Sequence, residues 1–230
     1  ETRRGGIQPA SSREDTPAGR PTGLAGKPTH RDAVVVEAQV DDALGFGISE
    51  LCFQGPADDL TATLNAQPAL LAHGAAVWAV VRDRIGPSVV AAAGHSLGEY
   101  SALVAAGTLQ FADAVRLVRR RGELMAAASE GTMAAVIGLE LDTLQAVCTE
   151  ASAAGAVVVA NENSPGQLVI SGSSAGVERA LALAKERGAK RVIPLSVSAA
   201  FHSPLMRDAA RGLEAAVAEI RQINAPRVPV

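Results

Sequence analysis

Residues 88–106 read SVVAAAGHSLGEYSALVAA, and this stretch decides the fold class. The small apolar residues at 88–93 predict a buried strand, and residues 100–106, closed by Gly107, predict a helix. Between the two, residues 94–98 read GHSLG and fit the G-x-S-x-G turn, in which a strand reverses sharply into a helix. A strand followed at once by a helix is typical of a layered α/β protein.

This turn predicts a nucleophile at Ser96. It would hold the serine in a strained conformation with its hydroxyl exposed, and side chains at Gly94 and Gly98 would clash. The start of the helix aims backbone N–H groups at the site, which favours developing negative charge. The five-residue pattern also occurs in ordinary strand-to-helix turns. His95, next to the serine, is expected to support packing or the turn rather than to catalyse.

Apolar periodicity organises the rest of the chain. It predicts a helix over residues 69–84, after Pro68, and another over 113–127. The block that follows is predicted to alternate in the order βαββαβ of a ferredoxin-like unit, with elements at 133–139, 141–153, 156–160, 167–171, 175–188 and 191–197. Because this block separates Ser96 from His202, we interpret it as an inserted subdomain.

Composition excludes several classes of protein. The 230 residues are 48% hydrophobic and carry a net charge of −3, so nothing indicates a nucleic-acid partner. No uninterrupted apolar run is long enough for a membrane helix and no signal-peptide core begins the chain, so we expect no membrane partner and a cytoplasmic location. Cys52 and Cys148 are predicted to be reduced packing residues.

Arg121 stands out on the predicted helix over residues 113–127. It shares one face with Leu117, Leu124 and Met125, whereas the other charged residues of this helix lie elsewhere. An arginine on an apolar face needs a partner, because a buried unpaired charge is costly. A substrate carboxylate would match its planar fork. Periodicity alone leaves two other readings open: pairing with an internal acid, or reaching out to water.

The stretch GHSLGEYSALVAA at 94–106 resembles the nucleophile region of malonyl-CoA:acyl-carrier-protein transacylases and of related acyltransferase domains of polyketide synthases. Five more segments resemble this family in the same order: LCFQGP at 51–56, QPALL at 67–71, RLVRRRGELM at 116–125, NSPGQLVISG at 163–172 and SAAFHSPLM at 198–206. The resemblance implies an α/β fold, in which a hydrolase-like parallel-sheet domain carries an inserted ferredoxin-like subdomain.

We therefore expect three parts in the chain. Residues 34–128 and 198–230 would form the larger α/β domain, and residues 129–197 the ferredoxin-like subdomain. Residues 1–33 are rich in proline and glycine and poor in large aliphatics, so we predict a disordered or atypical segment there.

The resemblance also implies a mechanism. His202 lies in a loop after a predicted strand, where a histidine is more often a surface residue, but the family's catalytic base falls on it. Ser96 would be acylated, and the backbone N–H of Leu97 would contribute to the oxyanion hole.

Three more positions match substrate-binding residues of the family. Arg121 would bind the free carboxylate of the malonyl group, Gln67 would line the site, and Phe201 resembles the malonyl-selecting form of its loop. The implied reaction moves a malonyl group from malonyl-CoA to the phosphopantetheine thiol of an acyl carrier protein. Coenzyme A is then part of a substrate, and neither a cofactor nor a metal is expected.

The sequence departs from the family at both ends. The family's N-terminal loop, roughly PGQGSQ, supplies a second oxyanion donor, whereas residues 10–17 read ASSREDTP. Relatives also continue well past Val230, so both regions are expected to be missing. Two alternatives stay open: an α/β-hydrolase acting as an esterase or thioesterase, and a non-catalytic remnant that binds a carrier protein. The absence of an HGGG-type loop, the inserted block and Arg121 argue against the hydrolase.

Overall fold

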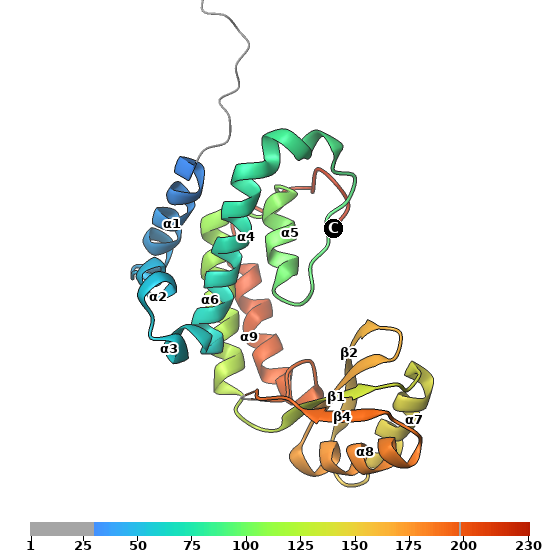
Figure 1. Cartoon of the computed structure of the whole chain (residues 1–230). Coiled ribbons are helices and arrows are strands. Elements are labelled where there is room, and N and C mark those ends of the chain that lie inside the picture. The colour runs from blue at the N-terminus through green and yellow to red at the C-terminus, as the bar shows by residue number, and fades with distance from the viewer. Residues whose placement is uncertain (1–29, 198) are drawn as a thin grey trace, which may run out of the picture.

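A computed structural model describes residues 30–197 and 199–230 of the chain. The predicted atypical segment 1–33 lies outside these residues except at 30–33, where the first helix begins. Two regions are apparent in Figure 1: a group of long helices, and a small sheet with two helices of its own. The helical group consists of α1 (His30–Leu44), α2 (Ile48–Gln54), α3 (Ala57–Thr61), α4 (Thr63–Ile85), η1 (Gly86–Ser88), α5 (Gly98–Ala105), α6 (Phe111–Ala127), η2 (Pro204–Met206) and α9 (Arg207–Ala218).

Helices α4 and α6 form the centre of the helical group. Both contact α1 and α5, and α9 packs on the other side of α6. A side chain at Gly122 would come within 2.7 Å of the Cα of Leu64, so glycine lets the two helices approach closely there. The core between the helices is aliphatic, and its fully buried side chains include Val40, Ile48, Leu71, Val115 and Val118. This packing fixes α6, the helix that carries Arg121, against α4, the helix that carries Gln67.

The predicted βαββαβ unit is confirmed. It consists of β1 (Thr132–Ile137), α7 (Leu141–Ala151), β2 (Val157–Ser164), β3 (Gln167–Gly172), α8 (Ser174–Glu186) and β4 (Arg191–Pro194). The strands form an antiparallel sheet in the order β2-β3-β1-β4, with β1 between β3 and β4, which is the ferredoxin-like arrangement. Helices α7 and α8 lie together beside this sheet (Figure 1). Strand β2 extends to Ser164, beyond the predicted end at residue 160, so the hairpin turn is tighter than expected.

The predicted strand over residues 88–93 does not join a sheet. Ser88 ends the short helix η1, and residues 89–94 run extended beside the C-terminal segment. The Ala92 N–H donates to the carbonyl of Pro229 at 2.8 Å, and Pro229 has no N–H with which to return a bond. The α/β class with its ferredoxin-like subdomain is confirmed, but the larger domain contains no parallel sheet among the residues that the structure describes.

The longest apolar element is the helical stretch Thr63–Ser88. By length and composition alone it could cross a membrane. Core helices of soluble proteins pass the same test, and α4 contacts α1, α5 and α6, but only 22% of the apolar stretch is buried. The absence of a membrane partner therefore stays a prediction.

Candidate active site

The turn around Ser96 has the strained geometry that its sequence predicts. Ser96 has φ 52°, in the left-handed region that L-residues rarely enter. Three backbone hydrogen bonds then start α5, from Gly98 to His95, from Glu99 to Ser96 and from Tyr100 to Leu97. The serine hydroxyl therefore lies at the N-terminal end of this helix, where partial positive charge favours an anion.

Glycine is needed on one side of this turn but not on the other. A Cβ atom at Gly94 would lie 1.9 Å from the backbone carbon of Gly98, which no rearrangement of side chains could relieve. A Cβ atom at Gly98 would meet nothing within 4 Å, because this residue faces an 820 Å³ cavity between α4, α5 and residues 89–94. The expected clash at Gly98 was therefore wrong, and the expected clash at Gly94 was right.

His202 reaches the nucleophile from the other end of the chain. Its Nε2 lies 3.1 Å from Ser96 Oγ. Like the serine, it has a left-handed backbone, with φ 57°, and no other non-glycine residue among those described has a positive φ. Ser203 holds this loop in place: its Oγ donates to the carbonyl of Ala200 at 2.7 Å and accepts from the N–H of Leu205 at 3.2 Å. Such strain persists only where surrounding contacts impose it, and it is concentrated at functional sites.

Arg121 completes the group around Ser96. One terminal nitrogen donates to Ser96 Oγ at 3.0 Å and the other donates to Gln67 Oε1 at 2.5 Å. Gln67 is 5% exposed, and its amide nitrogen donates to Thr63 Oγ1 at 3.3 Å and contacts Met125 Sδ at 3.4 Å. The structure therefore brings together four of the predicted site residues: Ser96, His202, Arg121 and Gln67.

The charge of Arg121 is not neutralised by an acid within the described residues. No Asp or Glu within the described part of the chain forms a salt bridge with it. The ring of Tyr100 lies beneath its guanidinium, 5.8 Å from the centroid, which is within the range of a cation–π contact. Of the readings left open by periodicity, pairing with an internal acid is excluded for the described residues. The guanidinium is held instead by neutral groups beside the nucleophile, where an anionic ligand could bind.

The electrostatic surroundings keep His202 neutral. Partial desolvation lowers the pKa of His202 from its ordinary value of 6.5, and the nearby positive charge of Arg121 and the His95 side chain lower it further. A neutral imidazole has a free nitrogen that can accept a proton from Ser96. Burial has the opposite effect on the phenol of Tyr100, whose pKa it raises.

Two further features surround the nucleophile. The backbone N–H of Leu97 has no hydrogen-bond acceptor within residues 30–197 and 199–230, so it is free to bind an oxyanion. A 130 Å³ cavity opens beside the serine–histidine pair, and Arg121, His202, Met125, Met206, Ala209, Ala210 and Leu213 line it. Phe201 is half-buried next to His202, and its role in selectivity stays a prediction.

Sequence reasoning missed two residues near the site. Tyr100 lies in the first turn of α5, four residues after Ser96, and this closeness to the nucleophile in sequence could have revealed it. Asn161 of β2 is the other: its Nδ2 lies 3.4 Å from Nε2 of His95, so the ferredoxin-like subdomain contacts the turn. No local sequence pattern predicts this contact, because only the tertiary fold brings the two residues together.

Comparison with known proteins agrees with this geometry. Residues 24–230 match the model of the acyl transferase domain. The chain belongs to this family. The malonyl CoA-acyl carrier protein transacylase of Haemophilus influenzae is 48% identical over 205 residues, which cover 86% of this chain and 65% of that protein. The chain therefore spans less than two thirds of the length of this curated relative.

Solved acyl transferase structures share the fold. The acyl-carrier-protein S-malonyltransferase of Burkholderia pseudomallei is 44% identical, with a TM-score of 0.83 over 86% of this chain and 66% of that one. A malonyl-transacylase in complex with its type II PKS acyl-carrier protein is 41% identical, with a TM-score of 0.83 over 87% of this chain and 65% of that one. These likenesses identify the helical group and the ferredoxin-like subdomain as parts of one acyl transferase fold.

Proposed function

We propose that this acyl transferase domain moves a malonyl group from coenzyme A to the phosphopantetheine thiol of an acyl carrier protein, through an acyl-enzyme on Ser96. The observation that carries the proposal is the guanidinium of Arg121, 3.0 Å from Ser96 Oγ and without a carboxylate partner among the described residues. An enzyme for neutral esters has no carboxylate on its acyl group with which such a cation could pair. A donor that carries a free carboxylate uses this cation to orient the acyl group.

In the first half-reaction, Ser96 Oγ attacks the thioester carbonyl of malonyl-CoA. His202 Nε2, at 3.1 Å, accepts the serine proton, and its lowered pKa keeps it in the neutral form that this step requires. The developing oxyanion accepts a hydrogen bond from the Leu97 N–H. The carbon–sulfur bond then breaks, the imidazolium returns its proton to the departing thiolate, and coenzyme A leaves as a thiol.

Arg121 changes partners when the substrate binds. In the structure its fork is shared between Gln67 Oε1 and Ser96 Oγ. The malonyl carboxylate accepts the hydrogen bond that Arg121 now donates to Ser96 Oγ, while Gln67 Oε1 keeps its own hydrogen bond from Arg121. This exchange removes a donor from the oxygen of Ser96, the atom that attacks, while its contact with His202 is kept, so substrate binding and activation of the nucleophile are coupled.

The second half-reaction reverses the first with a new thiol. The phosphopantetheine thiol gives its proton to His202 and attacks the malonyl ester on Ser96, and the serine leaves with that proton. The malonyl-transacylase solved with its type II PKS acyl-carrier protein supports a carrier protein as the partner of this chain. The proposal keeps residues 1–33 as a separate segment and residues 129–197 as a subdomain. It also places the enzyme in the cytoplasm and gives it neither a cofactor nor a metal.

An assay of both products tests this function. The protein is incubated with malonyl-CoA, with and without a phosphopantetheinylated carrier protein, and malonyl-carrier protein and free malonate are quantified. A transferase produces malonyl-carrier protein and little malonate, and Ser96→Ala abolishes the product. Release of malonate at the same rate with and without carrier protein would instead identify a thioesterase.

A further inference from the structure

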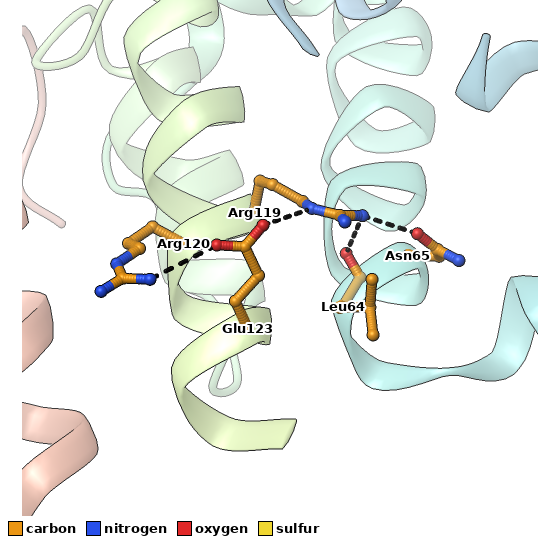
Figure 2. A network of polar contacts seen from close by, with 5 residues as sticks. All are labelled: Leu64, Asn65, Arg119, Arg120 and Glu123. Carbon is orange, nitrogen blue, oxygen red and sulfur yellow. Dashed lines mark hydrogen bonds and ion pairs between the residues drawn. The ribbon is translucent and has the colours of Figure 1, made fainter. Parts of the chain in front are cut away.

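Helix α4 contains a defect next to Gln67. The helix runs from Thr63 to Ile85 through Pro68, although the sequence predicts that it begins only after this proline. Proline has no backbone N–H, so the carbonyl of Leu64, four residues earlier, lacks its normal helical donor. Arg119 of α6 supplies a replacement: its Nη1 donates to the Leu64 carbonyl at 3.2 Å and to Asn65 Oδ1 at 2.7 Å (Figure 2).

Arg119 is itself held in place for this contact. Its Nε donates to Glu123 Oε1 at 2.9 Å, one turn along α6, and the ring of Phe46 lies 5.0 Å from its guanidinium. Its side chain is only 22% exposed. The neighbouring Arg120 points away from α4 in Figure 2, contacts Glu123 at 3.5 Å and is 53% exposed. Two adjacent arginines on one helix therefore differ in whether they touch α4.

The turn that Arg119 holds is the turn that orients Gln67. Thr63 begins this turn and accepts from the Gln67 amide nitrogen at 3.3 Å. That contact leaves Gln67 Oε1 facing Arg121, to which it is hydrogen-bonded. A shift of the first turn of α4 would move Thr63 away from the side-chain amide of Gln67. The amide would then be free to rotate, and its hydrogen bond to the guanidinium of Arg121 would weaken.

We propose that Arg119 is a positioning residue for Arg121. By replacing the donor that Pro68 lacks, it keeps the first turn of α4 helical, and this turn holds Gln67 against Arg121. The inference rests on the proposed function, in which Arg121 binds the malonyl carboxylate. Arg119 touches neither the nucleophile nor the substrate in this account, and its effect is confined to donors that carry a carboxylate.

A comparison of charged and neutral reagents tests this role. In Arg119→Met, the KM for malonyl-CoA rises about tenfold, the size expected when a hydrogen bond to a charged group is weakened. The rate at which phenylmethylsulfonyl fluoride, a neutral reagent, modifies Ser96 stays within twofold of the parent. Arg120→Met is the matched control and leaves both quantities unchanged. Arg119→Lys, which can still donate to the Leu64 carbonyl, recovers part of the lost affinity.

Three outcomes would overturn the inference. An unchanged KM for malonyl-CoA in folded Arg119→Met removes the positioning role, as does an equal loss with both reagents, which indicates general damage. If Arg119→Met shows no cooperative thermal melt, Arg119→Gln takes its place, since it also removes the guanidinium that donates to the Leu64 carbonyl, and an unchanged KM there has the same meaning. A parent that malonyl-CoA never acylates contradicts the proposed function itself, and the inference falls with it.

Discussion

Ser96 and His202 lie 106 residues apart in sequence, and both adopt left-handed backbones, with φ 52° and 57°, where Ser96 Oγ meets His202 Nε2 at 3.1 Å. Each such conformation costs about 1–3 kcal/mol and persists only where its surroundings impose it. The strain on Ser96 arises from a turn that only Gly94 permits, and the strain on His202 from a loop that Ser203 closes. The fold therefore spends stability on both partners of one hydrogen bond, which is the arrangement expected of a nucleophile and its base.

The pH dependence of Ser96 reactivity follows from the surroundings of His202. Because the pKa of His202 is lowered, its neutral form is present at pH values below the ordinary 6.5, and protonation removes the base only under more acidic conditions. The rate at which phenylmethylsulfonyl fluoride modifies Ser96 is followed by intact-protein mass from pH 5 to 8. We expect this rate to rise with pH, and the midpoint of the rise to lie below pH 6.5. A midpoint above 6.5 would contradict the account, and His202→Ala should abolish the titration.

Arg121 should decide which acyl donors are accepted. Replacing it with methionine removes the carboxylate partner while keeping the apolar stem, so kcat/KM for malonyl-CoA falls about 100-fold, the size of a lost hydrogen-bonded ion pair. Arg121→Lys keeps the charge but loses the fork, and its loss is smaller. Modification of Ser96 by the neutral sulfonyl fluoride should survive in both variants. If malonyl-CoA and the neutral reagent lose reactivity together, Arg121 supports the fold rather than the substrate.

The two glycines of the serine turn should differ in their tolerance. Gly94→Ala places a methyl group in the backbone of Gly98, so the turn cannot form and Ser96 modification is lost, with a lower melting temperature. Gly98→Ala points into open space, at the start of a helix where alanine is favourable, and retains modification. Equal loss in both variants would indicate that the cavity beside Gly98 is filled in solution.

Local sequence patterns predicted much of this structure. The alternation of strands and helices from 129 to 197 predicted the ferredoxin-like unit, because each element there buries one apolar face in a single small core. Apolar periodicity likewise predicted the helix over residues 113–127, and the G-x-S-x-G pattern predicted the turn at Ser96. His202 could be joined to Ser96 only through the resemblance to a family, since no spacing rule links residues so far apart.

The failures arise where distant residues overrule local preference. Pro68 predicted a helix boundary, but Arg119 supplies the donor that the helix needs and α4 continues through it. Residues 88–93 have the composition of a buried strand, but among the described residues only one backbone hydrogen bond, from Ala92 to Pro229, joins them to another segment, so no sheet forms there. Tyr100 beneath Arg121 was missed because aromatic residues on a helix ordinarily indicate core packing.

The central claim is that Ser96 becomes acylated by malonyl-CoA, and intact-protein mass spectrometry tests it most directly. The parent and Ser96→Ala are each incubated briefly with malonyl-CoA and weighed, with His202→Ala as a second comparison. The account predicts a gain of one malonyl group on the parent, none on Ser96→Ala and a much slower gain on His202→Ala. An adduct that persists in Ser96→Ala, or a folded parent that gains no mass, would contradict it.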